Sequence, residues 1–231
     1  MMYASAENYI LALSHDEVVH GKRSLIDKMW GTYDEKFAQL RLLYAFMYAH
    51  PGKKLLFMGG EFGQFSEWRF ADQLDWLLDG YDSHRKLMDF SRDLNILYKS
   101  HSCLYEIERE FGDWKGFKWL CADDSSNSVL GFMRSNNKGD ENIAVILNFT
   151  PVERKKYRIG TPLPGEYEVI LNTNSRSYGG DGKGSKKIKS KKVAANGYPY
   201  SLEINLPPFT AFYLKFKPIS TNQNNTKAQK K

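Results

Sequence analysis

One stretch of ten residues gathers five side chains that could take part in chemistry. A short apolar run, residues 9–13, leads into it, and the ionisable residues that follow are His15, Asp16, Glu17, His20 and Lys22. A buried strand delivers side chains in this way to the rim of a parallel sheet or barrel, where active sites are built. Neighbouring side chains on a strand point in opposite directions, so His15 and Asp16 can face one ligand only if the chain bends there. Taken alone, the pattern also fits a polar loop after a strand.

The residues after this cluster predict a helix and a second strand. Thr32 and Glu35 have the spacing of a capping box. Apolar residues then recur at helical spacing as far as Pro51-Gly52, which is expected to end the helix. A second apolar run, residues 54–58, is followed by a glycine-rich segment that contains Glu61. Both runs are apolar throughout, as in strands buried on both faces, so their order predicts a βαβ unit with parallel strands.

The periodicity of the sequence changes near residue 110. Before that point a second helix is expected, with Leu87, Phe90, Leu94 and Leu97 on one face. After it, short strands are expected at residues 117–121, 129–134, 143–149, 157–159, 167–171, 200–206 and 209–216. Regularly spaced short strands with polar turns between them predict an antiparallel β-sandwich.

This change in period predicts how the chain is divided. We expect an α/β part over residues 1–108, a β-sandwich over residues 109–218 and a disordered polar tail over residues 219–231. A glycine-rich loop, expected to be mobile, interrupts the strands at residues 177–190.

Four motifs in this order resemble a known family. They are SHDEVVHGK at residues 14–22, LLFMGGEFGQ at 55–64, LNFTPV at 147–152 and LPPFTAFYL at 206–214. The sequence resembles the C-terminal part of bacterial glycogen branching enzymes, which belong to the α-amylase superfamily, from about residue 3 to about residue 217. The resemblance implies that SHDE closes the seventh strand of a (β/α)₈ barrel and that LLFMGGEFGQ forms the eighth strand and its exit. The expected fold is therefore α/β plus all-β, with the last two strands and helices of such a barrel followed by an antiparallel β-sandwich.

The resemblance also implies a reaction and two roles in it. The family cuts an α-1,4-glucan, forms a glycosyl-enzyme intermediate and transfers the chain to a 6-hydroxyl as an α-1,6 branch. Asp16 resembles the superfamily's third carboxylate, which holds two hydroxyls of the sugar at the cleavage point, and a carboxylate with two acceptor oxygens suits this task. His15 resembles the histidine that donates a hydrogen bond to the same sugar.

The resemblance further implies that part of the catalytic set is missing. No position of this sequence matches the family's nucleophilic Asp or its general acid Glu. We therefore expect the chain alone to be inactive, and we expect its partners to be an α-glucan and the N-terminal part of the barrel.

Substrate-binding roles are expected for five further residues: Glu17, His20, Lys22, Glu61 and Trp68. Glu61 could orient active-site groups, although a structural ion pair or hydrogen bond at the rim is the favoured interpretation. Trp68 could stack its flat ring on a sugar or simply pack its loop onto the barrel. No group of His, Cys, Asp and Glu has metal-ligand spacing, so neither a metal nor another cofactor is expected.

Composition narrows the remaining classes of protein. The chain has 231 residues, a net charge of +6 and only two cysteines, Cys103 and Cys121, without metal or redox spacing. That usage suits a reducing compartment. With no apolar run near 18 residues and no signal-peptide pattern, we expect a cytoplasmic protein that does not enter a membrane. The lysines of residues 183–192 have no aromatic residues between them, so nucleic-acid binding is not expected.

Two other functions remain open from the sequence. A complete β-sandwich without a complete catalytic set would also fit a non-catalytic glucan-binding or interaction module. A fragment of a related α-glucan hydrolase would carry similar motifs. Only the resemblance favours transfer over hydrolysis.

Overall fold

The computed structural model describes residues 9–106, 108–110 and 113–218. It begins with strand β1 (Ile10–Leu13), the 3₁₀ helix η1 (His15–Glu17), helix α1 (Tyr33–Ala49) and strand β2 (Lys53–Leu56). β1 and β2 pair in parallel, with Ile10 opposite Lys53 and Leu13 opposite Leu56. The predicted strand, helix, strand order with parallel strands is therefore confirmed. The tail predicted at residues 219–231 lies outside the described residues.

Helix α1 begins and ends as its sequence predicts. The Thr32 hydroxyl accepts a hydrogen bond from the Glu35 N–H at 3.4 Å, and the Glu35 carboxylate accepts one from the Thr32 N–H at 2.7 Å. These bonds form the capping box and satisfy amides that the first turn leaves without partners. The helix ends at Ala49, two residues before Pro51.

After β2, the chain is again helical. The chain forms η2 (Trp76–Gly80), α2 (Asp82–Ser100) and the short α3 (Ser102–Tyr105). α2 buries Leu87, Phe90 and Leu94 along one face, as the sequence predicts. Strands β3 (Glu108–Glu110) and β4 (Asp113–Lys115) then form a two-stranded hairpin.

The rest of the described chain is all-β. Its main sheet has six strands in the order β10-β9-β12-β7-β6-β5, and β8 pairs with β11 in a separate two-stranded sheet. The bounds are β5 (Phe117–Asp124), β6 (Val129–Ser135), β7 (Asn142–Asn148), β8 (Arg154–Thr161), β9 (Gly165–Asn172), β10 (Lys187–Lys189), β11 (Tyr200–Leu206) and β12 (Thr210–Pro218). All these pairings are antiparallel. The sandwich predicted from the short strands is therefore present.

The segment expected as a glycine-rich loop contains regular structure. The 3₁₀ helix η3 (Arg176–Tyr178) and strand β10 both fall in this region. Ile188 is only 7% exposed and packs in the sandwich core between two outward-facing lysines. A single apolar residue in a lysine-rich run gives too weak an alternation to predict a strand, so the strand was missed.

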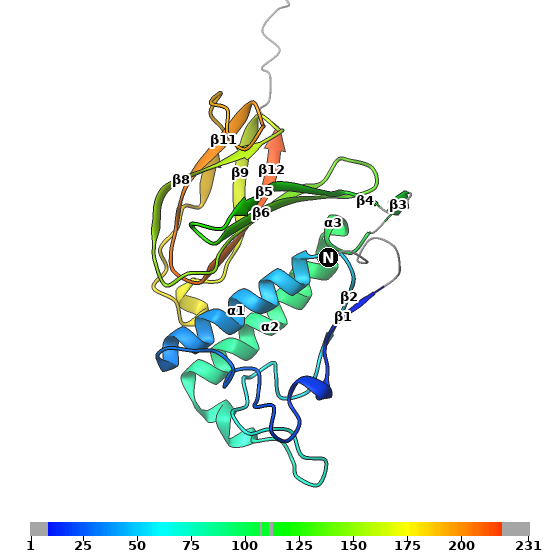
Figure 1. Cartoon of the computed structure of the whole chain (residues 1–231), viewed down its shortest axis with the longest axis vertical. Coiled ribbons are helices and arrows are strands. Elements are labelled where there is room, and N and C mark those ends of the chain that lie inside the picture. Colours follow the sequence, from blue (N-terminus) through cyan, green and yellow to red (C-terminus); the bar gives the residue numbers. More distant parts are fainter. Residues whose placement is uncertain (1–8, 107, 111–112, 219–231) are drawn as a thin grey trace, which may run out of the picture.

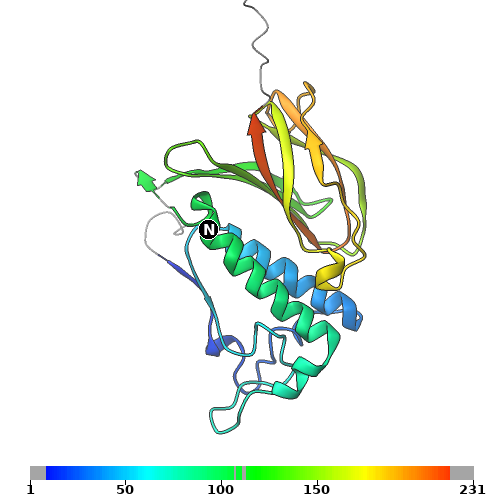
Figure 2. The same ribbon diagram turned by 180° about the vertical axis from the view of Figure 1, so that it is seen from behind.

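The six-stranded sheet is covered on both faces. Neighbouring residues of a strand point to opposite faces, and the two central strands show this directly. Ile146 and Phe212 pack with Leu202 of β11, whereas Val145 and Tyr213 pack in a second apolar cluster with helices α1 and α2. The molecule thus has three layers, namely the β8–β11 sheet, the six-stranded sheet and the helices α1 and α2. The two helices lie between the sandwich and the β1–β2 end of the chain (Figures 1 and 2).

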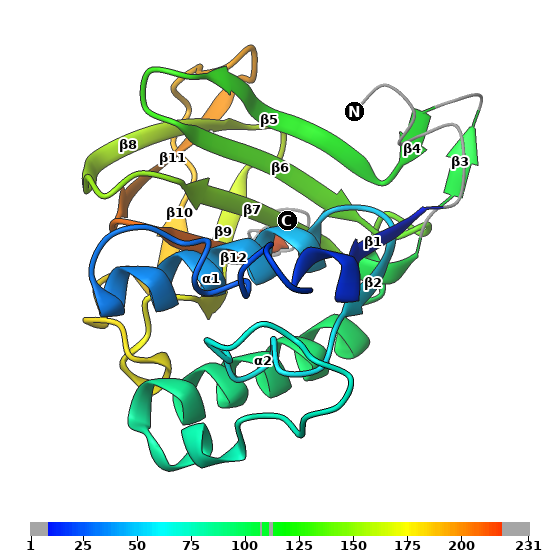
Figure 3. The same cartoon turned by 60° about the horizontal axis from the view of Figure 1, so that its bottom comes forward.

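Buried polar groups fasten α1 to the main sheet. The Arg134 guanidinium donates to the Ala49 carbonyl at 2.6 Å, and Arg41 Nε donates to the Thr173 carbonyl at 2.9 Å. Burial lowers the pKa of both arginines to about 10, so they stay charged at neutral pH. The Tyr213 hydroxyl donates to the Ala45 carbonyl. Figure 3 shows α1 lying along the main sheet.

No helix in the described residues is long and apolar enough to span a membrane.

Candidate functional site

The exits of β1 and β2 form the candidate site, because the carboxyl ends of parallel strands meet at one edge. The chain leaves strand conformation after Leu13 and turns at once into η1. The Ser14 hydroxyl accepts from the Asp16 N–H at 3.3 Å, and the Val18 N–H donates to the His15 carbonyl at 2.9 Å. The bend that the sequence requires for His15 and Asp16 to face one ligand is therefore present.

His15 and Asp16 lie together and are open to solvent. His15 Nε2 is 3.4 Å from Asp16 Oδ1, and their side chains are 53% and 68% exposed. Both can therefore exchange hydrogen bonds with a bound molecule. The Asp16 carboxylate offers acceptors only, whereas the His15 ring can also donate.

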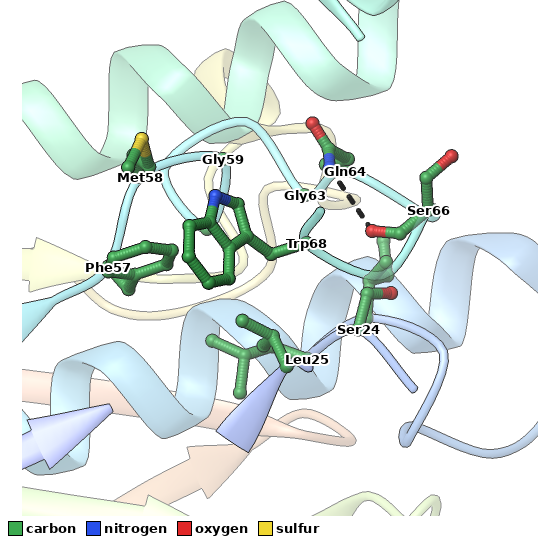
Figure 4. A pocket seen from close by; sticks show the side chains of 12 residues that line it. Ser24, Leu25, Phe57, Met58, Gly59, Gly63, Gln64, Ser66 and Trp68 are labelled. Atoms are coloured by element: carbon green, nitrogen blue, oxygen red, sulfur yellow. Dashed lines mark hydrogen bonds between the residues drawn. The ribbon is translucent and has the colours of Figure 1, made fainter. Parts of the chain in front are cut away.

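Two aromatic rings from the second strand exit hold the His15 ring. Phe57 and Trp68 each lie 6.0 Å from it between ring centroids, and they meet each other edge to face at 5.2 Å. Figure 4 shows the Phe57 and Trp68 rings side by side. Trp68 thus packs its loop against the strand exits, as one interpretation of the sequence expects, and it also touches a proposed site residue.

Trp68 lines two recesses in the surface. A narrow pocket lies between it and Leu25, Gly59 and Gln64 (Figure 4). A wider recess of about 290 Å³ shares Gln64 and Trp68 and extends to Arg69. Gln64 shapes both, because its amide donates to the Ser66 carbonyl at 3.1 Å and accepts from the Asp75 N–H at 2.9 Å.

Glu67 ties the two strand exits together, and sequence analysis did not single it out. Its two carboxylate oxygens accept from the N–H groups of Gly21 at 3.0 Å and Arg23 at 2.7 Å. His20 Nδ1 lies 3.5 Å from the same carboxylate. The two backbone hydrogen bonds lower the pKa of Glu67. The next residue, Trp68, donates its N–H to the Val18 carbonyl at 2.8 Å.

The other predicted residues occupy different positions. Glu17 lies 3.8 Å from Lys28, which also donates to the Glu17 carbonyl, so its contacts are local. Lys22 is exposed in the turn after η1. Glu61 is half-buried and its carboxylate has no ion-pair partner among the described residues, so its expected ion pair or hydrogen bond at the rim stays a prediction. Its backbone carbonyl accepts from Ser91 at 3.2 Å.

The structure therefore brings together three of the predicted residues directly, namely His15, Asp16 and Trp68. It brings His20 to them through Glu67. Within the described residues, no group of three or more His, Cys, Asp or Glu side chains could hold a metal ion.

Comparison with known proteins shows which proteins the chain is similar to. Residues 119–217 match the family model of the alpha amylase C-terminal all-beta domain. A 1,4-alpha-glucan branching enzyme from Halothermothrix orenii is 48% identical over 95% of this chain and 34% of its own length. Those from Thiobacillus denitrificans and Aquifex aeolicus are 50% and 49% identical over 93% and 92% of this chain, and over 29% and 34% of their own lengths. The chain matches a C-terminal portion of the 1,4-α-glucan branching enzymes. It spans about a third of the length of these branching enzymes, as a C-terminal portion of such an enzyme does.

Solved structures support the fold of this branching-enzyme portion. The crystal structure of AmyP in complex with maltose aligns with a TM-score of 0.54 at 16% identity, over 79% of this chain and 35% of that one. A variant of AmyP in complex with maltotriose aligns with a TM-score of 0.55 at 17% identity, over 80% of this chain and 35% of that one. At such low identity the likeness concerns the fold alone.

Proposed function

We propose that residues 1–108 supply the last two strands and helices of a (β/α)₈ barrel and that the sandwich begins near residue 109. The parallel register of β1 and β2, with helix α1 between them in sequence and α2 after them, supports this arrangement. The match of residues 119–217 to the alpha amylase C-terminal all-beta domain supports the all-β assignment of the second part.

In the whole protein, the reaction is transfer of an α-1,4-glucan chain to a 6-hydroxyl to form an α-1,6 branch. A retaining mechanism needs a nucleophilic carboxylate, an acid/base carboxylate and bonds to sugar hydroxyls that strengthen in the transition state. Asp16 supplies the last of these by accepting from two hydroxyls. His15 donates to the same sugar, and the Trp68 ring packs against the imidazole ring of His15. The observation that carries the proposal is the exposed His15–Asp16 pair at a parallel-strand exit.

The partner of this site is the N-terminal part of the barrel. In a closed barrel every strand has two neighbours, whereas β1 and β2 pair only with each other among the described strands. Ile10 and Met58, at opposite ends of this pair, are 59% and 51% exposed. Open strand edges beside exposed apolar side chains are the surfaces that neighbouring strands would cover.

Mixing tests this proposal. The purified chain and the separately expressed N-terminal remainder of the Aquifex aeolicus branching enzyme are incubated with amylose, alone and together, and α-1,6 linkages are measured by proton NMR. Branching is expected only in the mixture, and Asp16→Asn in the chain should abolish it. Branching by the chain alone would refute the expectation that the nucleophilic and acid/base carboxylates come from the N-terminal part. An inactive mixture of two folded, associated parts would refute the assignment of this site.

A glucan-binding role for the isolated chain is a second candidate. Phe70 is 89% exposed and Trp76 is 56% exposed, both on the segment that carries Trp68, and flat apolar rings suit pyranose faces. A few kcal/mol of binding corresponds to dissociation constants in about the millimolar range. Titration of the chain with maltoheptaose, followed by tryptophan fluorescence, should show such binding, and Trp68→Ala should weaken it.

A further inference from the structure

The loops that follow β1 and β2 are joined by two neighbouring residues, Glu67 and Trp68. Glu67 accepts from Gly21 and Arg23 through both carboxylate oxygens, and Trp68 donates to the Val18 carbonyl. We propose that Glu67 is a positioning residue for His15 and Asp16, fixing the turn after η1 against the second strand exit. The inference rests on the proposed function only in assigning sugar contacts to His15 and Asp16.

Val18 passes the restraint from Glu67 and Trp68 to the site. Its N–H closes η1 by donating to the His15 carbonyl, and its carbonyl accepts from Trp68. Val18 is buried, so this link is shielded from water. Trp68, whose N–H makes this bond to Val18, also places its side-chain ring against the His15 ring. A shift of the 18–23 turn would therefore move η1 and the ring that flanks His15 together.

The backbone of the turn explains why a carboxylate stands at position 67. Gly21 and Arg23 have φ angles of 79° and 66°, in the left-handed region. Glycine adopts this region readily, but for Arg23 it is a strained conformation. Hydrogen bonds to a charged acceptor are about twice as strong as neutral ones. The two bonds from the Glu67 carboxylate offset the cost of the turn and aim both N–H groups at one point.

The charges around Glu67 favour its ionised form. The two backbone N–H groups have the largest effect in lowering its pKa, followed by the smaller attractions of His20 and Arg69, and only partial burial opposes them. At neutral pH the side chain is therefore a carboxylate with two acceptor oxygens. A glutamine has the same shape but one acceptor oxygen, and its NH₂ group would face one of the two backbone N–H groups.

NMR on the 231-residue chain tests the structural step. In Glu67→Gln, amide exchange at Gly21 and Arg23 should become at least about tenfold faster, because a hydrogen bond to a charged group is lost. The nuclear Overhauser contacts between the His15 and Trp68 rings should weaken, while those between Phe57 and Trp68 persist. Unchanged exchange, or faster exchange with intact contacts between His15 and Trp68, would overturn the positioning role.

Two further variants separate charge from geometry. Glu67→Asp keeps the charge but is one methylene shorter, so it should behave like Glu67→Gln if bidentate reach matters. Wild-type behaviour of Glu67→Asp would show that charge alone suffices and would contradict the bidentate clamp. Asp79→Asn is the matched control, because it removes an exposed carboxylate of η2, in the same connecting region, and should leave all signals unchanged.

Activity in the reconstituted mixture tests the functional step. Glu67→Gln should lower kcat at least about tenfold with little change in KM for amylose, because misplaced His15 and Asp16 weaken contacts made mainly in the transition state. An unchanged kcat would overturn the proposal. If the unsubstituted mixture does not branch although its two parts are folded and associated, the proposed function fails, while the NMR result still decides whether Glu67 positions the turn.

Discussion

Asp16 is the side chain whose loss should change turnover most. Its carboxylate is exposed beside His15, and the proposed bonds to two sugar hydroxyls strengthen in the transition state. Asp16→Asn keeps the shape but halves the number of strong acceptors, so turnover of the reconstituted enzyme should fall at least about a hundredfold, or about 2.7 kcal/mol. The absorption spectrum of the iodine complex of amylose follows the reaction. Asp79→Asn is the control and should keep near-normal activity. Activity of Asp16→Asn as high as that of this control would contradict the role of Asp16.

Glu141 should make stability depend on acid pH. Burial alone would raise its pKa, but hydrogen bonds from His101 at 2.7 Å and from the Cys103 N–H and Lys215, each at 3.2 Å, outweigh burial and lower the pKa to about 2. A carboxylate with a lowered pKa stabilises the fold above its ordinary pKa near 4.5, and this stabilisation is lost as pH falls from there to about 2.

The variant Glu141→Gln should therefore be less stable than the parent at pH 7 and nearly equal to it at pH 2. Urea unfolding of both proteins across this range measures the difference. Asp123→Asn, which removes an exposed carboxylate of β5, should show no such convergence. A gap between parent and Glu141→Gln that stays constant with pH would show that the lost hydrogen bonds, and not the charge, matter.

Sequence predicted the local part of the site and missed its long-range part. The bend at His15 and Asp16 could be expected because a strand pattern stops there and polar residues follow. Glu67 could not, since its partners Gly21 and Arg23 are 46 and 44 residues away and are backbone groups. Glu141 gave no signal for the same reason, with partners 38 to 74 residues distant. Side chains that bind distant backbone leave no periodic pattern.

At the scale of elements, the central strands of the main sheet should be its most protected part. β7 and β12 each have a strand on both sides and layers above and below. β1 and β2 pair only with each other among the described strands, and their apolar side chains are partly exposed. Hydrogen exchange should therefore be slow over residues 143–149 and 209–216 and fast over residues 55–58. The reverse order would contradict the assignment of β1–β2 as part of an incomplete sheet.

The elements that sequence predicted well are those with strong local signals. α1 has a capping box at one end and Pro51 near the other, and both bounds agree with the structure. The strands with several apolar residues were expected close to their observed positions. β10 was missed because Ile188 alone faces the core, and α3 was missed because four residues are too short for a helical period to appear.

At the scale of the whole molecule, the core does not stop at the predicted domain boundary. One apolar cluster joins α1 and α2 to the face of the main sheet that carries Phe132, Val145 and Tyr213. The polar contacts of Arg41 and Arg134 cross the same junction. The change of period near residue 110 marks a change of secondary structure, and periodicity carries no information about which faces pack together. The domain boundary near residue 109 therefore stays a prediction from the sequence. It does not indicate that the two parts unfold separately.

This shared core predicts how the two parts unfold. The whole chain should unfold in one cooperative transition, because breaking the junction exposes the apolar face of the sheet as well as the helices. Residues 109–218 expressed alone keep the cover of β8 and β11 but lose that of α1 and α2, so they should melt at a lower temperature and bind the dye ANS. Thermal melts followed separately by near-ultraviolet and far-ultraviolet circular dichroism test this. Two separate transitions in the whole chain, or an excised sandwich as stable as the whole chain and without dye binding, would show that the sandwich closes its own core.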